Sequence, residues 1–159
     1  MRVIETVNEM VKWPRTNDTV LVPTMGALHE GHRELIRAGK NLTGDEGTLI
    51  VSIYVNPTQF NDKKDFKSYP KTFDQDYKLC EKEGVDLIFS PSDSEMYSGK
   101  ETFSVTQNKL MKYLCGASRS GHFEGVCTVV TKLFNIIKPA SAIFGKKDAQ
   151  QLFLIKEMV

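Results

Sequence analysis

The chain has 159 residues, of which 40% are hydrophobic and 26% charged, and its formal net charge is +1. These values are typical of one ordinary globular domain, and the small net charge argues against a protein that binds nucleic acid through bulk electrostatics. No stretch approaches the roughly 20 apolar residues of a membrane span. The N-terminus lacks the apolar core of a signal peptide, so the cytoplasm is the expected compartment.

The three cysteines, Cys80, Cys115 and Cys127, are odd in number and show no C-x-x-C spacing. That pattern favours neither a disulfide framework nor a zinc site. We therefore expect all three to be packing or surface thiols.

Apolar residues recur at helical spacing from Val3 to Val11, and Pro14 interrupts them, which predicts an N-terminal helix before the first strand. Apolar, β-branched runs predict strands at 20–22, 48–55, 85–90 and 140–144. Amphipathic patterns predict helices at 33–41, 70–83, 124–138 and 149–158. Two further segments read as an extended edge at 102–106 and a short helix at 108–114. The alternation predicts an α/β fold with a doubly wound, Rossmann-like parallel sheet, as one domain over residues 1–159.

The most informative segment is 23–32, Pro-Thr-Met-Gly-Ala-Leu-His-Glu-Gly-His, between a predicted strand and a predicted helix. Gly26 and Gly31 would let a phosphate approach the backbone, and the imidazoles of His29 and His32 can donate hydrogen bonds to it. The helix N-terminus adds backbone N–H groups and a positive dipole end. Two alternatives are a pair of histidines that only cap the helix and a metal pair, for which no third ligand accompanies the motif.

Polar clusters also follow two other predicted strands, at 56–60 and at 145–148. The carboxyl ends of parallel strands meet at one edge of a sheet, where α/β proteins bind ligands. We expect Asp148 to cap the last helix and Lys147 to point into the shared crevice. The amides of Gln59 and Gln151 could hold the carboxylate and hydroxyls of a hydroxy acid, although amides near helix starts are often only caps.

Five blocks in this order resemble the pantothenate synthetase family: segment 23–32, Val-Asn-Pro-Thr-Gln-Phe at 55–60, Tyr-Pro at 69–70, Gly-His-Phe-Glu-Gly-Val at 121–126, and Phe-Gly-Lys-Lys-Asp-Ala-Gln-Gln-Leu at 144–152. His-x-Gly-His alone, the HIGH motif, is shared with other nucleotidyltransferases and class I aminoacyl-tRNA synthetases. The resemblance implies an AMP-forming ligase that joins pantoate to β-alanine in coenzyme A precursor synthesis. Its reaction passes through pantoyl adenylate and consumes ATP, releasing pyrophosphate and then AMP.

The resemblance also implies residue roles. The expected ATP site comprises Met25, Gly26, Ala27, Leu28, His29, Glu30, Gly31, His32, Gly145, Lys146, Lys147 and Asp148. His29, His32 and Lys147 are the expected catalytic residues: His32 as proton donor to the departing pyrophosphate, and Lys147 to offset charge on the α-phosphate. Gln59 and Gln151 should bind pantoate, and Gln59 should also lie near β-alanine.

Further implications concern the acid's surroundings and the partners. Val129 and Val130 could present an apolar wall to the two methyl groups of pantoate, although helix valines are more often plain core. Mg²⁺ is expected with ATP, with no protein ligand assigned and Asp76 as one candidate. A homodimer is expected.

The chain departs from the family at Ser120, where members usually have proline, and at Lys71, where they have arginine. Family members also continue with another strand, a Ser-Ser-Arg-Asn segment and a small C-terminal lid domain, so we expect an N-terminal part of a longer enzyme. Two alternatives stay open. One is a nucleotidyltransferase with a different acceptor, and the other is a non-catalytic nucleotide-binding or dimerisation module.

Overall fold

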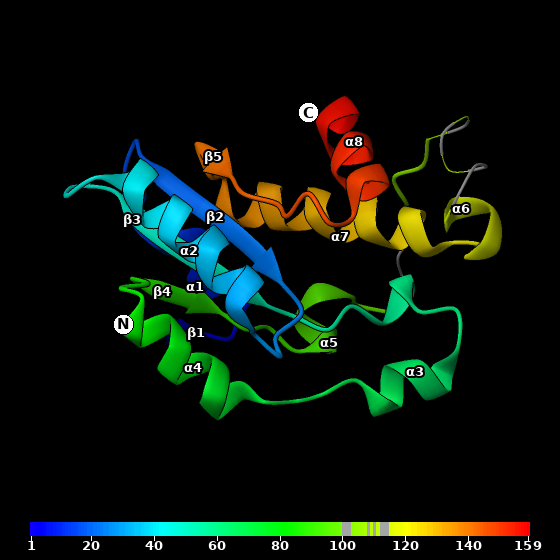
Figure 1. The fold of residues 1–159 in the computed structure, drawn as a ribbon, viewed down its shortest axis with the longest axis horizontal. Helices are drawn as coiled ribbons and strands as arrows, with labels where there is room; N and C mark the ends of the chain where they lie inside the picture. Colours follow the sequence, from blue (N-terminus) through cyan, green and yellow to red (C-terminus); the bar gives the residue numbers. More distant parts are fainter. Residues whose placement is uncertain (100–102, 108, 110, 112–114) are drawn as a thin grey trace.

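The structure, a computed structural model, describes residues 1–99, 103–107, 109, 111 and 115–159 (Figure 1). Its centre is a five-stranded sheet in which every pairing is parallel and the order is β1-β4-β3-β2-β5. The strands are β1 (Arg2–Ile4), β2 (Thr19–Thr24), β3 (Thr48–Ile53), β4 (Leu87–Phe89) and β5 (Ser141–Ala142).

Helices alternate with these strands along the chain. They are α1 (Val7–Lys12), α2 (Glu30–Thr43), α3 (Lys63–Ser68), α4 (Phe73–Lys82), α5 (Asp93–Met96), α6 (Cys115–Ser118), α7 (His122–Ile137) and α8 (Ala149–Met158), with a 3-10 turn, η1 (Pro57–Gln59). In the part of the chain that the structure describes, no helix is both long and apolar enough to cross a membrane.

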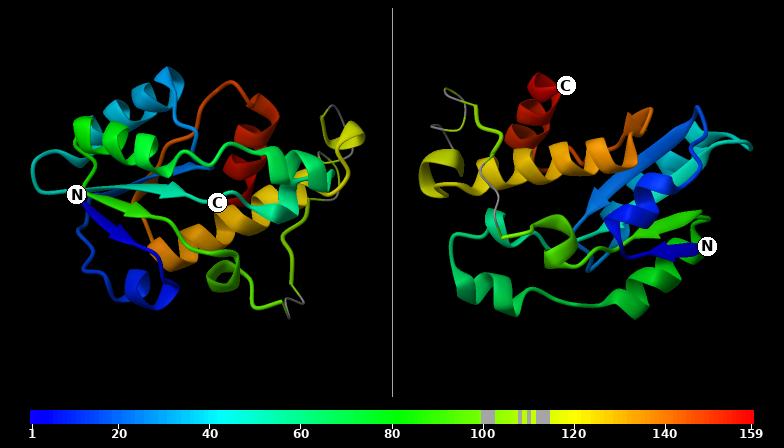
Figure 2. Two further views of the ribbon diagram at one scale, coloured as in Figure 1. Left: turned by 90° about the horizontal axis from the view of Figure 1, so that it is seen from below. Right: turned by 180° about the vertical axis from the view of Figure 1, so that it is seen from behind.

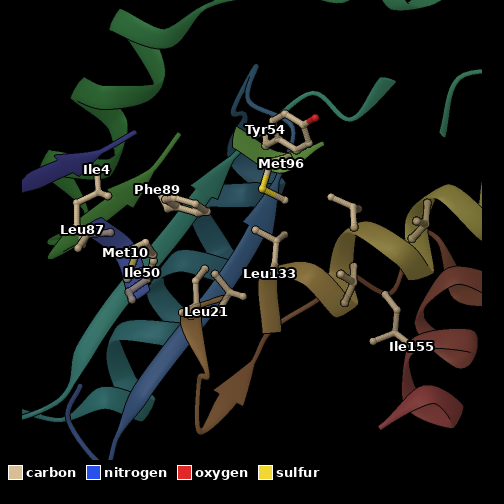
Figure 3. Close-up of a cluster of buried hydrophobic side chains, with 14 residues drawn as sticks. Ile4, Met10, Leu21, Ile50, Tyr54, Leu87, Phe89, Met96, Leu133 and Ile155 are labelled. Atoms are coloured by element: carbon tan, nitrogen blue, oxygen red, sulfur yellow. The ribbon is translucent and has the colours of Figure 1, made fainter. Parts of the chain in front are cut away.

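Helices cover both faces of the sheet, as the left view of Figure 2 shows. Alternate strand residues point to opposite faces: Leu21 packs in the core beneath α1 and α7, whereas Val20 and Val22 pack beneath α2 and α4. Figure 3 shows the first of these cores, to which Met10 of α1 and Leu133 of α7 both contribute. The predicted doubly wound α/β fold is confirmed.

The N-terminal prediction is wrong in part. Arg2–Ile4 is not helical but forms β1, an edge strand paired with β4, and only Val7–Lys12 is a helix. Thr6 separates the two, because its side chain accepts a hydrogen bond from the N–H of Glu9 (3.3 Å) and so begins the helix there. Apolar spacing alone did not reveal this cap.

Other boundaries moved by a few residues. The predicted helix at 33–41 begins at Glu30, inside the histidine segment, and the helix predicted from Pro70 begins at Phe73. The expected edge at 102–106 has no strand over its described residues, 103–106. Most of the short helix expected at 108–114 lies outside the described residues.

Cys80 and Cys127 are free and buried, which confirms them as packing thiols, whereas the side chain of Cys115 lies outside the described part. Burial raises the pKa of Cys80 to about 12, with a further contribution from the negative charge of Asp76. Such a thiol stays protonated at neutral pH and is not a nucleophile.

A close backbone contact joins α7 to η1, the turn that carries Gln59. A Cβ at Gly125 would lie 2.6 Å from the carbonyl carbon and oxygen of Thr58 and 2.8 Å from the backbone nitrogen of Gln59. Only glycine allows this approach, because backbone atoms cannot rotate away as a side chain can.

We predict that Gly125→Ala lowers the free energy of unfolding by about 1–3 kcal/mol, since α7 and η1 must separate. The matched control is Gly39→Ala within α2, whose new methyl would meet the end of the Leu49 side chain, 2.6 Å away. The Leu49 side chain can move, so Gly39→Ala should lower the free energy of unfolding by less. Urea unfolding of the three proteins tests this, and equal losses would contradict it.

Candidate active site

The order of the strands in the sheet reverses at β2, the strand next to the edge strand β5. β2 lies between β3, the next strand in the chain, and β5, the last described strand. Ligands bind in α/β proteins outside the carboxyl ends of the strands at such a switch. The histidine segment follows β2, η1 follows β3 and the turn at 145–148 follows β5, so all three predicted clusters lie at the same edge of the sheet.

The two histidines of the segment cap α2. His29 is the N-cap residue, and its Nδ1 accepts a hydrogen bond from the N–H of Gly31 (3.0 Å). Nδ1 of His32 accepts from the N–H of His29 (3.3 Å), and the two ring centroids are 4.2 Å apart. Both histidines therefore cap the helix, but capping uses only one nitrogen of each ring: with both Nδ1 atoms accepting, each neutral ring carries its proton on Nε2. Each ring can still donate from Nε2 to an anion.

Burial lowers the pKa of His32 most. Electrostatic repulsion by His29 and by Lys147 lowers it further, whereas the negative charge of Asp76 raises it. The net direction is downward, so in the free protein His32 is neutral at pH 7. Phosphates brought close to this ring would favour its charged form.

The turn before the histidines has an uncommon backbone. Gly26 has φ +76° and Ala27 has φ +50°. This left-handed region costs a residue with a Cβ about 1–2 kcal/mol. The N–H groups of Ala27 and Leu28 donate to the two carboxylate oxygens of Asp76 at 3.0 and 2.7 Å. Asp76 therefore holds the turn, and both of its oxygens are engaged with backbone rather than presented as the Mg²⁺ ligand that the sequence left open.

A hydrogen-bond chain orients the amide of Gln59. Oδ1 of Asn56 accepts from the N–H of Thr58 (3.4 Å) and from the Tyr97 hydroxyl (3.0 Å), so Nδ2 is its donor end. Nδ2 of Asn56 donates to the carbonyl of Gly125 (3.1 Å) and to Oε1 of Gln59 (3.3 Å). Its NH₂ group donates one hydrogen to Sδ of Met25 (2.7 Å), so the second N–H of that amide is the donor that remains for a ligand.

His122, the first residue of α7, fixes the backbone beside that amide. Its Nδ1 donates to the carbonyl oxygen of Gln59 at 2.8 Å, since a carbonyl can only accept. Burial lowers the pKa of His122, and the charge of Arg119 lowers it further. The hydrogen bond to the Gln59 backbone and the charge of Asp148 raise it, but the net shift of this pKa is downward. His122 thus carries its neutral proton on Nδ1, the opposite tautomer to the two capping histidines.

Two adjoining pockets open at this edge. The smaller, about 190 Å³, reaches into the fold along the apolar side of α7 and is lined by Pro23, Thr24, Met25, His32, Tyr54, Gln59, Tyr69, Val126, Val129, Val130, Leu133, Phe144, Asp148 and Gln151. The larger, about 520 Å³, is lined by Met25, Gln59, Phe60, Tyr69, Arg119, His122, Phe123, Lys147, Asp148, Ala149, Gln150 and Gln151. The two linings share Met25, Gln59, Tyr69, Asp148 and Gln151, so the two pockets form one site.

The site gathers six of the expected residues: Met25, His32, Gln59, Lys147, Asp148 and Gln151. Val129 and Val130 form part of the apolar wall, as the sequence suggested. Asp148 is the N-cap residue of α8 but makes no capping hydrogen bond with its side chain, contrary to expectation. Its carboxylate is exposed at the mouth of the site instead.

Other expected residues lie outside these two linings. Glu30 forms an ion pair with Arg33 (2.6 Å) on the exposed side of α2. Lys146 lines a separate groove between β5 and α8. Ala27, Leu28, His29 and Gly31 shape the turn and the helix start rather than the pocket walls.

Sequence reasoning assigned no role to Tyr69, Arg119 or His122, which all line the larger pocket. Burial and the negative charge of Asp76 raise the pKa of Tyr69, so its hydroxyl remains a donor at neutral pH. Tyr69, His122 and their neighbours lie in blocks that carried the family resemblance, which was the only signal for them.

The lowered histidine pKa values predict how stability depends on pH. Histidine in the unfolded chain titrates near 6.5, so below that pH the unfolded state binds more protons than the folded state. The free energy of unfolding should be highest above pH 6.5. It should decrease as the pH falls toward the pKa values of His32 and His122 in the folded protein. His32→Gln keeps a capping acceptor but cannot titrate, so its urea midpoint should fall less between about pH 7.5 and 5.5. An equal fall in both proteins would contradict this prediction.

Comparison with known proteins identifies the family. A family model described as pantoate-beta-alanine ligase matches residues 2–159. Pantothenate synthetases of Akkermansia muciniphila and Thermotoga petrophila are 53% identical over 151 residues and 51% identical over 164 residues. These alignments cover 94% and 100% of this chain but 54% and 58% of the relatives, so the chain spans little more than half of their length.

Solved structures agree with the sequence comparison. Pantothenate synthetase from Thermus thermophilus superposes with a TM-score of 0.92 at 40% identity, covering 100% of this chain and 57% of that chain. Pantoate-beta-alanine ligase from Francisella tularensis, complexed with beta-gamma ATP and beta-alanine, gives a TM-score of 0.92 at 37% identity, covering 100% and 62%. The chain therefore belongs to the pantoate-beta-alanine ligase family.

Proposed function

We propose that this chain is the ATP- and pantoate-binding part of a pantothenate synthetase, which condenses pantoate with β-alanine at the expense of ATP. One observation carries the proposal. The α2 histidine His32, the amides Gln59 and Gln151, and Lys147 meet around a single site at the switch point of the sheet.

The smaller pocket suits pantoate. Its volume of about 190 Å³ is below the roughly 300–1,000 Å³ of drug-sized ligand sites, so it fits a small acid. Val126, Val129, Val130 and Leu133 give it an apolar wall for two methyl groups. The second N–H of the Gln59 amide donates to the acid, and the amide of Gln151 supplies a further polar contact.

The nucleotide lies at the mouth of the site. The N-terminus of α2 offers its dipole to the phosphates, and Nε2–H of His32 donates to them. Lys147 is exposed beside Asp148 in the larger pocket, where its ammonium offsets negative charge on the α-phosphate.

In the first step, a carboxylate oxygen of pantoate attacks the α-phosphorus of ATP. The bond from that phosphorus to the bridging oxygen breaks, which gives pantoyl adenylate and pyrophosphate. The charge of the bound phosphates raises the pKa of His32 from its lowered value, so that His32 can give a proton to the leaving pyrophosphate.

In the second step, the amine of β-alanine attacks the acyl carbon of the adenylate. A C–N bond forms, the bond to the AMP oxygen breaks, and the amine loses its proton. Gln59 lines both pockets, so it can hold the acyl group while β-alanine occupies the larger one.

Mg²⁺ enters the proposal as part of the ATP substrate. Among the described residues, no three His, Cys, Asp or Glu side chains cluster as a metal site. Mg²⁺ at such centres commonly binds substrate phosphates and only one or two carboxylates, and Asp148 is the carboxylate that lines the site. The ion would clamp and neutralise the phosphates. The family resemblance further implies a cytoplasmic homodimer, whose mass analytical ultracentrifugation can measure.

The test is pantoate-dependent exchange of pyrophosphate into ATP, measured on the protein expressed from its intact gene. We expect exchange with pantoate, and pantothenate once β-alanine is added. His32→Gln and Lys147→Met should each slow exchange by about 10²–10³-fold, because each removes a donor to developing charge. Lys156→Met, an exposed lysine on α8, is the matched control and should leave the rate unchanged.

Three outcomes would contradict the proposal. Exchange with another acid and none with pantoate would favour a different nucleotidyltransferase. ATP binding without any exchange would favour a non-catalytic module. Full exchange in His32→Gln would remove the role assigned to that histidine.

A further inference from the structure

The carboxylate of Asp76 is buried beneath the turn that joins β2 to α2. Asp76 lies in the first turn of α4 and is 2% exposed. None of the ion pairs between described residues includes it. A buried charge without a cation is costly unless hydrogen bonds replace its water.

Three donors replace that water, and two of them are consecutive backbone groups. The N–H of Leu28 donates to Oδ1 at 2.7 Å, and the N–H of Ala27 donates to Oδ2 at 3.0 Å. The Thr72 hydroxyl, on the residue before α4, donates to Oδ2 at 3.1 Å. The carboxylate therefore links the first turn of α4 to a segment 48 residues away in sequence.

The contact is close as well as polar. A Cβ at Gly26 would lie 3.0 Å from Oδ2 of Asp76 and 3.1 Å from Cγ2 of Ile53. Gly26 and Ala27 both have positive φ. Ala27 carries a Cβ, so the conformational freedom of glycine does not explain its positive φ. A non-glycine residue keeps such a conformation only where its surroundings impose it. Here the two amides must point at the carboxylate, and that requirement imposes it.

We propose that Asp76 is a positioning residue: by accepting both amides of the 26–28 turn it sets where α2 begins and how His29 and His32 face the site. His29 follows the second of these amides directly and is the N-cap of α2. For its bearing on nucleotide binding the inference rests on the proposed function, whereas the bracing itself does not.

The proposal requires a carboxylate and not merely a polar side chain. An asparagine at position 76 has one acceptor oxygen, and its NH₂ group would face the second amide donor to donor. The charge also acts on His32, since Asp76 opposes the effects of burial, His29 and Lys147 on the pKa of that histidine. Loss of this charge should therefore lower the pKa of His32, whereas a change in packing alone would not.

The test uses NMR on the ¹⁵N-labelled 159-residue chain. In the unmutated protein, the amides of Ala27 and Leu28 should exchange slowly with solvent although they lie in a turn. Asp76→Asn should speed exchange of at least one of them about tenfold or more, because a hydrogen bond to a charged group is lost. It should also lower the pKa of His32, read from the ring ¹⁵N shifts. The matched control is Asp74→Asn, an exposed residue of the same helical turn, which should change neither.

Several results would overturn the inference. Rapid exchange of both amides in the unmutated chain would do so without any variant. Unchanged exchange and an unchanged His32 pKa in Asp76→Asn would do so as well. If Asp76→Asn does not fold, Thr72→Val replaces it. Without the hydroxyl that fixes Oδ2 the carboxylate can turn about its Cβ–Cγ bond, so both amides should exchange faster, and unchanged exchange of both would count against the proposal.

The bracing role of Asp76 and the proposed function can be refuted independently of each other. If MgATP leaves the spectrum of the unmutated chain, and of the protein from the intact gene, unaltered while both amides behave as expected, the bracing role stands and nucleotide binding does not. If MgATP shifts the α2 resonances but Asp76→Asn leaves both amides and His32 unaffected, the reverse holds.

Discussion

The parallel pairing of β2 with both β3 and β5 is the constraint on which the site depends. The carboxyl ends of parallel strands lie at the same edge of a sheet, so an inner strand with two parallel neighbours brings the three following turns together. These turns come from residues 25–29, 56–60 and 143–148, more than one hundred residues apart at the extremes. The hydrophobic cores on the two faces hold this sheet, and the polar groups are added at its edge.

At that edge each capping histidine uses one ring nitrogen for the structure of the helix start and keeps the other as a donor. The Nδ1 atoms of His29 and His32 satisfy amides at the start of α2, and this fixes the proton on Nε2, where a phosphate could receive it. The His122 ring is set in the opposite sense by the carbonyl of Gln59. Capping and ligand binding are therefore not competing explanations of these histidines. The capping hydrogen bond determines which ring nitrogen carries the proton, and that nitrogen is the one that can donate to a ligand.

Much of the fold followed from the sequence because its cause is local. The β-branched runs predicted at 48–55 and 20–22, and the amphipathic pattern of α7, each identify an element without reference to the rest of the chain. β1 was missed because Val3 and Ile4 fit a helical spacing as well, and only pairing with β4, some 85 residues away, decides between strand and helix. Tertiary contacts of that kind leave no local trace.

The site divides in the same way. The residue types at 29, 32, 59, 147 and 151 pointed to anion and acid binding, and the structure brings His32, Gln59, Lys147 and Gln151 together. What could not be predicted is which partner each side chain meets. Asp76 was considered as a metal ligand and proves to accept two backbone amides. Asp148 was expected to cap α8 and is its N-cap residue, but its side chain makes no capping hydrogen bond.

The lengths of the strands have a consequence for association between molecules. Within the described residues, the inner strands β2 and β3 have six residues each and the inner strand β4 has three, whereas the edge strands β1 and β5 have three and two. An edge strand exposes unpaired N–H and C=O groups on which another chain can extend the sheet, and very short edges give such a chain little to pair with. The long, apolar strands that would aggregate most readily are those enclosed on both sides. Strand order alone therefore places the two longest apolar strands of the described chain where both of their edges are already paired.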